Sequence, residues 1–102
     1  MVMFLKVHEV KQGGNFELVV ALCDDDLIGK NLGDDFFVSP RFYKGKKTSK
    51  KRALENLSVA SVINAVGKIS VQLLLDSKLV KEENVVKVGG VPHAQVFVMK
   101  KL

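Results

Sequence analysis

Apolar residues alternate with Lys6 and His8 over residues 3–10, which is the two-residue period of a half-buried β-strand. A Gln-Gly-Gly-Asn sequence at 12–15 then supplies residues that tolerate positive φ, as a tight turn requires. A second apolar run with β-branched residues follows at 16–23. The pattern therefore predicts an N-terminal β-hairpin.

The stretch after this hairpin carries turn and loop residues instead of a regular period. Any of the three aspartates at 24–26 can cap a helical turn at 27–30, which nearby glycines limit to about one turn. Residues 36–38 fit a short strand, and Pro40 ends it because proline donates no ladder hydrogen bond.

From Ser49 onward, apolar residues recur largely at steps of three and four, as they do on one face of a helix. These residues are Leu54, Leu57, Val59, Val62, Ile63, Val66, Ile69, Leu73 and Leu74. One helix reaching Leu79 would be unusually long, so we expect two helical pieces with a break or bend at Ser58 or Gly67.

The C-terminal part of the chain reads as two closing strands, at 84–88 and 94–99, with a Gly-Gly-Val-Pro turn at 89–92. The order is strand, strand, helix, strand, strand. We therefore predict an α+β fold, a single compact domain over residues 1–102. Its sheet is mostly antiparallel and is covered on one face by the central helical segment.

Composition agrees with one globular domain, since 102 residues with 47% hydrophobic content suffice for a core. No apolar run approaches the roughly 20 residues that span a bilayer. The single cysteine, Cys23, cannot form an internal disulfide, which fits a reducing compartment. We expect a soluble, cytoplasmic protein without membrane contact, whose oligomeric state the sequence leaves open.

The charge is concentrated in one place. Seven of the 16 basic residues lie in the segment from Arg41 to Arg52, which contains no acidic residue. The rest of the chain contains the other nine basic residues and 11 acidic ones. The net charge of +5 therefore comes from this segment, which also holds Phe42 and Tyr43. Such a segment indicates binding to a polyanion such as RNA or DNA. Because 14 of the basic residues are lysines, which lack the planar fork that reads guanine, we expect little base specificity.

The end of the basic segment coincides with the predicted start of a helix. If Thr48 or Ser49 is the N-cap, three cations occupy the first turn, next to the positive end of the helix dipole. This arrangement is unfavourable unless an anion binds there. The predicted nucleic-acid-binding residues are Lys30, Arg41, Tyr43, Lys44, Lys46, Lys47, Lys50, Lys51 and Arg52. Arg41 and Tyr43 would contact a base or sugar and the others phosphate; the alternative is a solvated, lysine-rich loop with Phe42 in the core.

Several short motifs occur in a fixed order along the chain: Cys-Asp at 23–24, Leu-Ile-Gly-Lys at 27–30, Arg-Phe-Tyr-x-Gly at 41–45, Asn-Ala-Val-Gly at 64–67 and Gly-Gly-Val-Pro-His-Ala-Gln at 89–95. Together they resemble the archaeal family catalogued as domain of unknown function 424, over about residues 3–97. The resemblance implies a protein of the archaeal cytoplasm whose gene lies near those of translation factors, and no assigned reaction. It implies a motif face of unknown role that comprises Cys23, Asp24, Asn64, His93 and Gln95.

Our leading hypothesis is a small RNA-binding or ribosome-associated accessory protein of translation, with RNA or a ribosomal subunit as partner and no cofactor. One alternative is a protein-interaction module in which His93, Gln95 and Tyr43 dock an acidic protein such as a translation factor. The other is an enzyme with Cys23 as nucleophile and His93 as base. No metal site is expected, because one cysteine and two histidines lack paired-ligand spacing.

Overall fold

The computed structural model describes residues 2–98 of the chain. Its elements follow one another as β1 (Met3–Gln12), β2 (Asn15–Asp24), the 3-10 helix η1 (Asp25–Leu27), β3 (Asn31–Leu32), β4 (Phe36–Phe37), α1 (Pro40–Tyr43), β5 (Lys46–Thr48), α2 (Lys50–Leu57), β6 (Val62–Val66), α3 (Lys68–Asp76), the 3-10 helix η2 (Glu82–Asn84), β7 (Val86–Val88) and β8 (Val91–Phe97). The α+β class predicted from the sequence is confirmed. No helix in the described part of the chain is long and apolar enough to cross a membrane.

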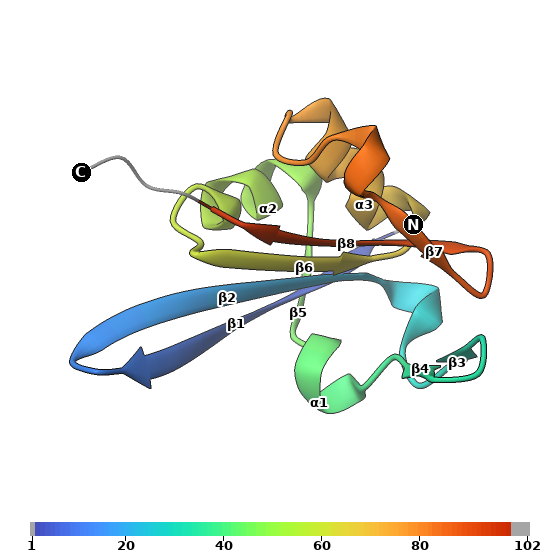
Figure 1. The fold of residues 1–102 in the computed structure, drawn as a ribbon, viewed down its shortest axis with the longest axis horizontal. Helices are drawn as coiled ribbons and strands as arrows, with labels where there is room; N and C mark the ends of the chain where they lie inside the picture. The colour runs from blue at the N-terminus through green and yellow to red at the C-terminus, as the bar shows by residue number, and fades with distance from the viewer. Residues whose placement is uncertain (1, 99–102) are drawn as a thin grey trace.

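The predicted N-terminal hairpin is present and longer than expected. β1 and β2 pair antiparallel over ten residues each, from Met3 opposite Asp24 to Gln12 opposite Asn15. Gly13 and Gly14 form the two-residue turn with φ of 54° and 87°, a conformation that favours glycine. Figure 1 shows this hairpin extending beyond the rest of the sheet.

The predicted helical segment contains a strand. Both proposed breaks are real, since α2 ends at Leu57 and α3 begins after Gly67, but the residues between them form β6. β6 pairs parallel with β2 and antiparallel with β8, so it lies in the interior of the sheet. A strand covered on both faces is apolar without alternation, and its spacing can imitate a helix.

One mixed sheet of six strands, in the order β5-β1-β2-β6-β8-β7, separates two layers (Figure 1). Helices α2 and α3 cover one face, which we call the helix face. The larger core lies there, and its fully buried side chains include Leu22, Ile63 and Leu74. Burial of such side chains, worth about 1.5–3 kcal/mol each, holds the helices on the sheet.

Residues 25–43, which comprise η1, β3, β4 and α1, form a small lobe on the opposite face of the sheet, which we call the lobe face (Figure 1). A second core joins the lobe to the sheet and includes Cys23, Val38, Tyr43 and Val66. The lobe covers only one end of its face, so the far ends of the central strands stay open to solvent there.

The closing strands differ from their predicted bounds. η2 takes up the start of the predicted 84–88 strand, and β8 begins at Val91 because the turn needs only Gly89 and Gly90. Met99, the last residue of the predicted 94–99 strand, lies outside the described residues.

Candidate functional site

The basic segment forms an edge of the sheet and the start of a helix. β5 is the edge strand beside β1, and α2 begins two residues after it. Ser49 is the N-cap of α2, as predicted, and its side chain accepts a hydrogen bond of 3.3 Å from the backbone N–H of Arg52. The first turn of α2 contains no acidic residue, so its positive charge is not balanced locally.

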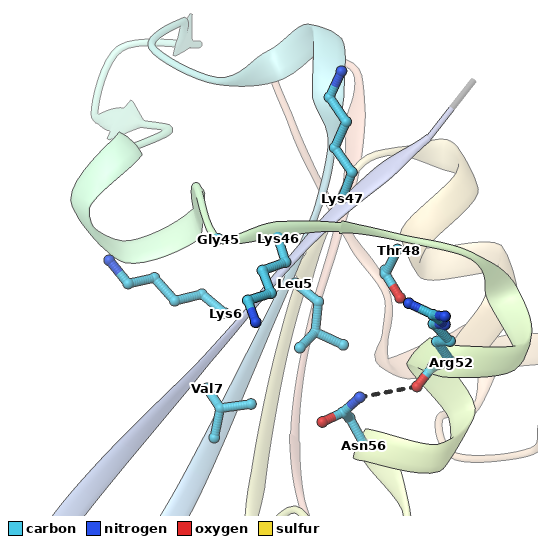
Figure 2. Close-up of a pocket in the computed structure, with 9 residues that line it drawn as sticks. All are labelled: Leu5, Lys6, Val7, Gly45, Lys46, Lys47, Thr48, Arg52 and Asn56. Atoms are coloured by element: carbon cyan, nitrogen blue, oxygen red, sulfur yellow. Dashed lines mark hydrogen bonds between the residues drawn. The ribbon is translucent and has the colours of Figure 1, made fainter.

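All seven basic side chains of residues 41–52 are exposed. They do not share one direction, because successive residues of a strand point to opposite faces. Lys46 and Thr48 pair with Leu5 and Met3 and share the helix face with them, while Lys47 lies on the lobe face. Figure 2 shows Lys47 pointing away from Lys46.

A groove of about 500 Å³ lies between β5, β1 and α2 (Figure 2). Its lining residues are Leu5, Lys6, Val7, Gly45, Lys46, Lys47, Thr48, Arg52 and Asn56. The amide of Asn56 donates a hydrogen bond of 3.0 Å to the backbone carbonyl of Arg52, which joins the wall of the groove across one turn of α2. The groove combines cations with hydroxyl and amide groups, which suits an anionic ligand that also offers hydrogen-bonding groups.

Gly45 explains how β5 approaches β1. A Cβ at this position would overlap the backbone carbonyl of Leu5, although the φ of Gly45 lies outside the left-handed region. Close approach, and not backbone conformation, therefore requires glycine here. The glycine of the Arg-Phe-Tyr-x-Gly motif thus brings the basic edge onto the sheet.

The remaining predicted cations lie apart from the groove. Arg41 is on α1, Lys44 follows it, and Lys50 and Lys51 lie in the first turn of α2 without lining the groove. Lys30 is exposed on the lobe and does not line the groove either. Of the predicted residues, Lys46, Lys47 and Arg52 line the groove, with Lys47 pointing to the opposite face from Lys46, and the others lie around the groove or on the lobe.

Two residues that the sequence analysis did not assign to a site hold α1 in place. The ammonium of Lys6 donates a hydrogen bond of 2.6 Å to the carbonyl of Arg41, and His8 Nε2 donates one of 2.8 Å to the carbonyl of Phe42. The His8 and Phe42 rings also stack at 4.8 Å. Carbonyls near the end of a short helix lack partners within it, so these side chains satisfy them. The alternation over residues 3–10 placed both side chains on one strand face, which was the available signal.

Tyr43 is buried, with 4% of its surface exposed, so the prediction that it contacts a base or sugar is wrong. Its hydroxyl donates a hydrogen bond of 2.5 Å to Asn64 Oδ1 on β6, and its ring meets Phe42 edge to face at 4.8 Å. Phe42 is half-buried against His8 and Tyr43, as the alternative reading expected of a core residue. The aromatic pair therefore attaches α1 to the sheet.

Asn64 joins motif residues from three parts of the chain. Its Oδ1 also lies 3.2 Å from His93 Nε2, and because Oδ1 only accepts, both Tyr43 and His93 donate to it. The His93 ring meets Phe36 of the lobe at 4.9 Å. Burial lowers the pKa of His93, so this side chain is neutral at physiological pH.

His93 and Gln95 project from the same face of β8, as predicted, but only His93 joins this network. Gln95 is exposed beyond the lobe.

Cys23 is fully buried, and its thiol donates a hydrogen bond of 3.1 Å to the carbonyl of Asp24. Burial, with a smaller effect from the neighbouring aspartates, raises the pKa of this thiol to about 12. A thiol in this environment stays protonated at neutral pH, and a nucleophile needs the opposite shift. The arrangement is that of a core cysteine.

Asp24 caps a different helix from the one predicted. Its carboxylate accepts hydrogen bonds from the N–H of Ile69 at 3.0 Å and from the N–H and hydroxyl of Ser70, both at 2.8 Å, so it caps α3 and not η1. Gly67, with φ of 112°, makes room for this carboxylate, which a Cβ there would overlap. The cap is satisfied within the chain, and in the described residues no group of three His, Cys, Asp or Glu side chains could hold a metal ion.

Comparison with known proteins gives one family and one fold relative. The family described as "Protein of unknown function (DUF424)" matches residues 13–99. A crystal structure of an uncharacterized conserved protein from Methanopyrus kandleri has 28% sequence identity and a TM-score of 0.80, and the alignment covers 100% of this chain and 97% of that one. No curated protein matches.

Proposed function

The chain belongs to the DUF424 family of proteins of unknown function, and from this premise we propose that it is a small cytosolic RNA-binding protein associated with the ribosome or with translation. It binds phosphates along β5 and the first turn of α2. The observation that carries the proposal is the exposure of all seven basic side chains of residues 41–52, three of which line a groove at one sheet edge.

The energetics of α2 support an anionic ligand. Lys50, Lys51 and Arg52 occupy a first turn that repels cations by about 0.3–1 kcal/mol each at low salt. An anion at this turn offsets that repulsion, because the free amides, the dipole and the side chains all attract it. Lys46, on the strand β5 that precedes α2, extends the positive electrostatic field over the groove.

The residue types favour phosphate over base recognition. Five of the seven basic residues in the segment are lysines, which act as point charges, and Tyr43 is enclosed by the fold. The ligand would therefore be recognised by the path of its phosphates more than by its sequence. RNA with an ordered shape, such as ribosomal RNA, has this property.

The test is the salt dependence of binding to duplex and single-stranded RNA, with co-sedimentation on purified ribosomal subunits. If five or six phosphates are neutralised, the log-log slope of affinity against salt is about −4.5 to −5.4 for a duplex. A variant in which serine replaces Lys46, Lys47, Lys50 and Lys51 should show a slope below about half that value.

A matched control replaces Lys68, Lys78, Lys81 and Lys87 by serine. These four lysines are exposed on or near α3, η2 and β7, away from β5, and the control removes the same total charge. Equal loss of affinity in both variants would show that net charge alone binds RNA and would refute the proposed surface.

A protein partner is the second candidate, favoured by Phe97, which is 70% exposed on β8 beside Gln95. Because Tyr43 and His93 are held by Asn64, such docking would depend on Gln95 and Phe97 instead of the trio that the sequence predicted. Ribosome co-sedimentation that persists at high salt and is lost in Phe97→Ser would support it. Salt-sensitive binding that is unchanged in Phe97→Ser would reject it.

A further inference from the structure

The outer edge of β1 is only partly covered. β1 pairs with β2 along its whole length, while β5 pairs only with Met3, Phe4 and Leu5. In the described residues, no strand lies against the edge of β1 from Val7 to Gln12. This edge belongs to the hairpin that extends from the sheet in Figure 1.

The direction of the backbone groups along this edge follows from Leu5. The carbonyl of Leu5 points toward β5, because it is the group that a side chain on Gly45 would overlap. In an antiparallel pair the N–H and C=O groups of alternate residues point to opposite edges. Val7, Glu9 and Lys11 therefore direct their N–H and C=O groups outward, to the uncovered side.

The uncovered edge has only part of the usual protection. Natural edge strands are kept short, carry lysine or proline, or are bent by a bulge. β5 fits this description with three residues and two lysines. The uncovered part of β1 carries Lys11, but it is six residues long, its register with β2 is unbroken, and it leaves Val7 and Val10 exposed by 42% and 39%. An edge of this kind pairs readily with another strand.

We propose that a second copy of this chain covers the edge, with the two β1 strands antiparallel about a two-fold axis at Val10. In this register Glu9 of each chain lies opposite Lys11 of the other. Both residues direct their backbone groups outward, so each such pair exchanges two main-chain hydrogen bonds. Opposite charges directly across two strands stabilise their pairing. Val10 meets Val10 of the second copy at the centre.

Charge selects this register over its neighbour. Moving the axis to Glu9 would also match outward-facing backbone groups, but it would place the two Glu9 side chains opposite each other, which is destabilising. The axis at Val10 also brings Gly13 of the second copy opposite Val7. The two sheets then form one sheet of twelve strands.

Two single charge reversals test the proposal in RNA-free, low-salt buffer. Sedimentation equilibrium of the wild type should show a concentration-dependent dimer. Glu9→Lys places lysines opposite lysines at both sites, and Lys11→Glu places glutamates opposite glutamates, so each variant alone should dimerise at least about tenfold more weakly. An equimolar mixture of the two restores opposite charges at every position and should recover the dimer.

The mixture distinguishes a lost interface from a lost fold, because misfolded variants would not complement each other. Circular dichroism and thermal unfolding of each variant provide a second check, since Lys11 also lies 5.9 Å from the centre of the Phe16 ring. A wild type that stays monomeric at every concentration tested would overturn the proposal. So would single variants that dimerise as the wild type does, or a mixture that fails to associate.

Discussion

Replacing Asp24 by alanine should destabilise the protein by about 3 kcal/mol. An N-cap side chain contributes about 0.5–2 kcal/mol. Here the carboxylate is 97% buried and accepts three hydrogen bonds, so its removal also leaves donors of Ile69 and Ser70 without a protein partner. Each buried donor left unsatisfied costs about 1–3 kcal/mol, reduced where water enters the space of the lost carboxylate. Asp24→Asn keeps one acceptor oxygen and should lose about half as much.

Urea unfolding followed by circular dichroism measures the effect. With a slope of about 1.5 kcal/mol per M, the midpoint of Asp24→Ala should fall by about 2 M. Asp26→Ala is the matched control, because this exposed aspartate lies two residues away and its removal should change stability by less than about 0.5 kcal/mol. Equal midpoints for Asp24→Ala and wild type would refute the assignment of Asp24 as the cap of α3.

Three further predictions concern the buried network and the thiol. Tyr43→Phe removes one donor to Asn64 and should lower the unfolding free energy by about 1 kcal/mol in urea titrations. An unchanged unfolding free energy would show that this hydrogen bond does not stabilise the fold. At pH 8 the native Cys23 thiol should react with a disulfide reagent at least about a thousandfold more slowly than in urea, because a pKa of about 12 leaves little thiolate; comparable rates would contradict its burial. The lowered pKa of His93 favours the neutral form in the fold, so its contribution is present above pH 6.5 and is lost as pH falls below it. His93→Gln should therefore flatten the pH dependence of stability below pH 6.5, and a slope equal to that of wild type would refute this role.

The parts of the fold that sequence reasoning recovered depend on local signals. The hairpin was predictable because Leu5 and Val7 alternate with Lys6 and His8 ahead of two glycines, and the start of α2 because Ser49 precedes the charged turn. β6 was not, because Ile63, Ala65 and Val66 are buried in cores on opposite faces of the sheet, and a strand buried on both faces need not alternate. Its identity depends on pairing with β2, which lies far away in sequence and leaves no local trace.

In the candidate site, too, local signals were predictable and long-range contacts were not. Exposure of the lysines followed from their charge, whereas the inward position of Tyr43 depends on Asn64, which lies in the strand that periodicity concealed. Asp24 was one of three aspartates predicted as a possible cap, but the helix that it caps begins at Lys68, beyond the reach of local spacing rules. Contacts between residues distant in sequence decided each of these outcomes.

The position of β6 also has a consequence for how the chain folds. The hairpins β1–β2 and β7–β8 join neighbouring segments, and such hairpins form within about 1–10 μs. β6 lies between these hairpins in the sheet. When β6 pairs with β2, Ser61 meets Leu18, which lies 43 residues earlier in the sequence. Closing that distance costs chain entropy before burial compensates for it. We expect the insertion of this strand to limit the folding rate, so that in stopped-flow circular dichroism Ile63→Val slows refolding while substitutions in β7 mainly accelerate unfolding.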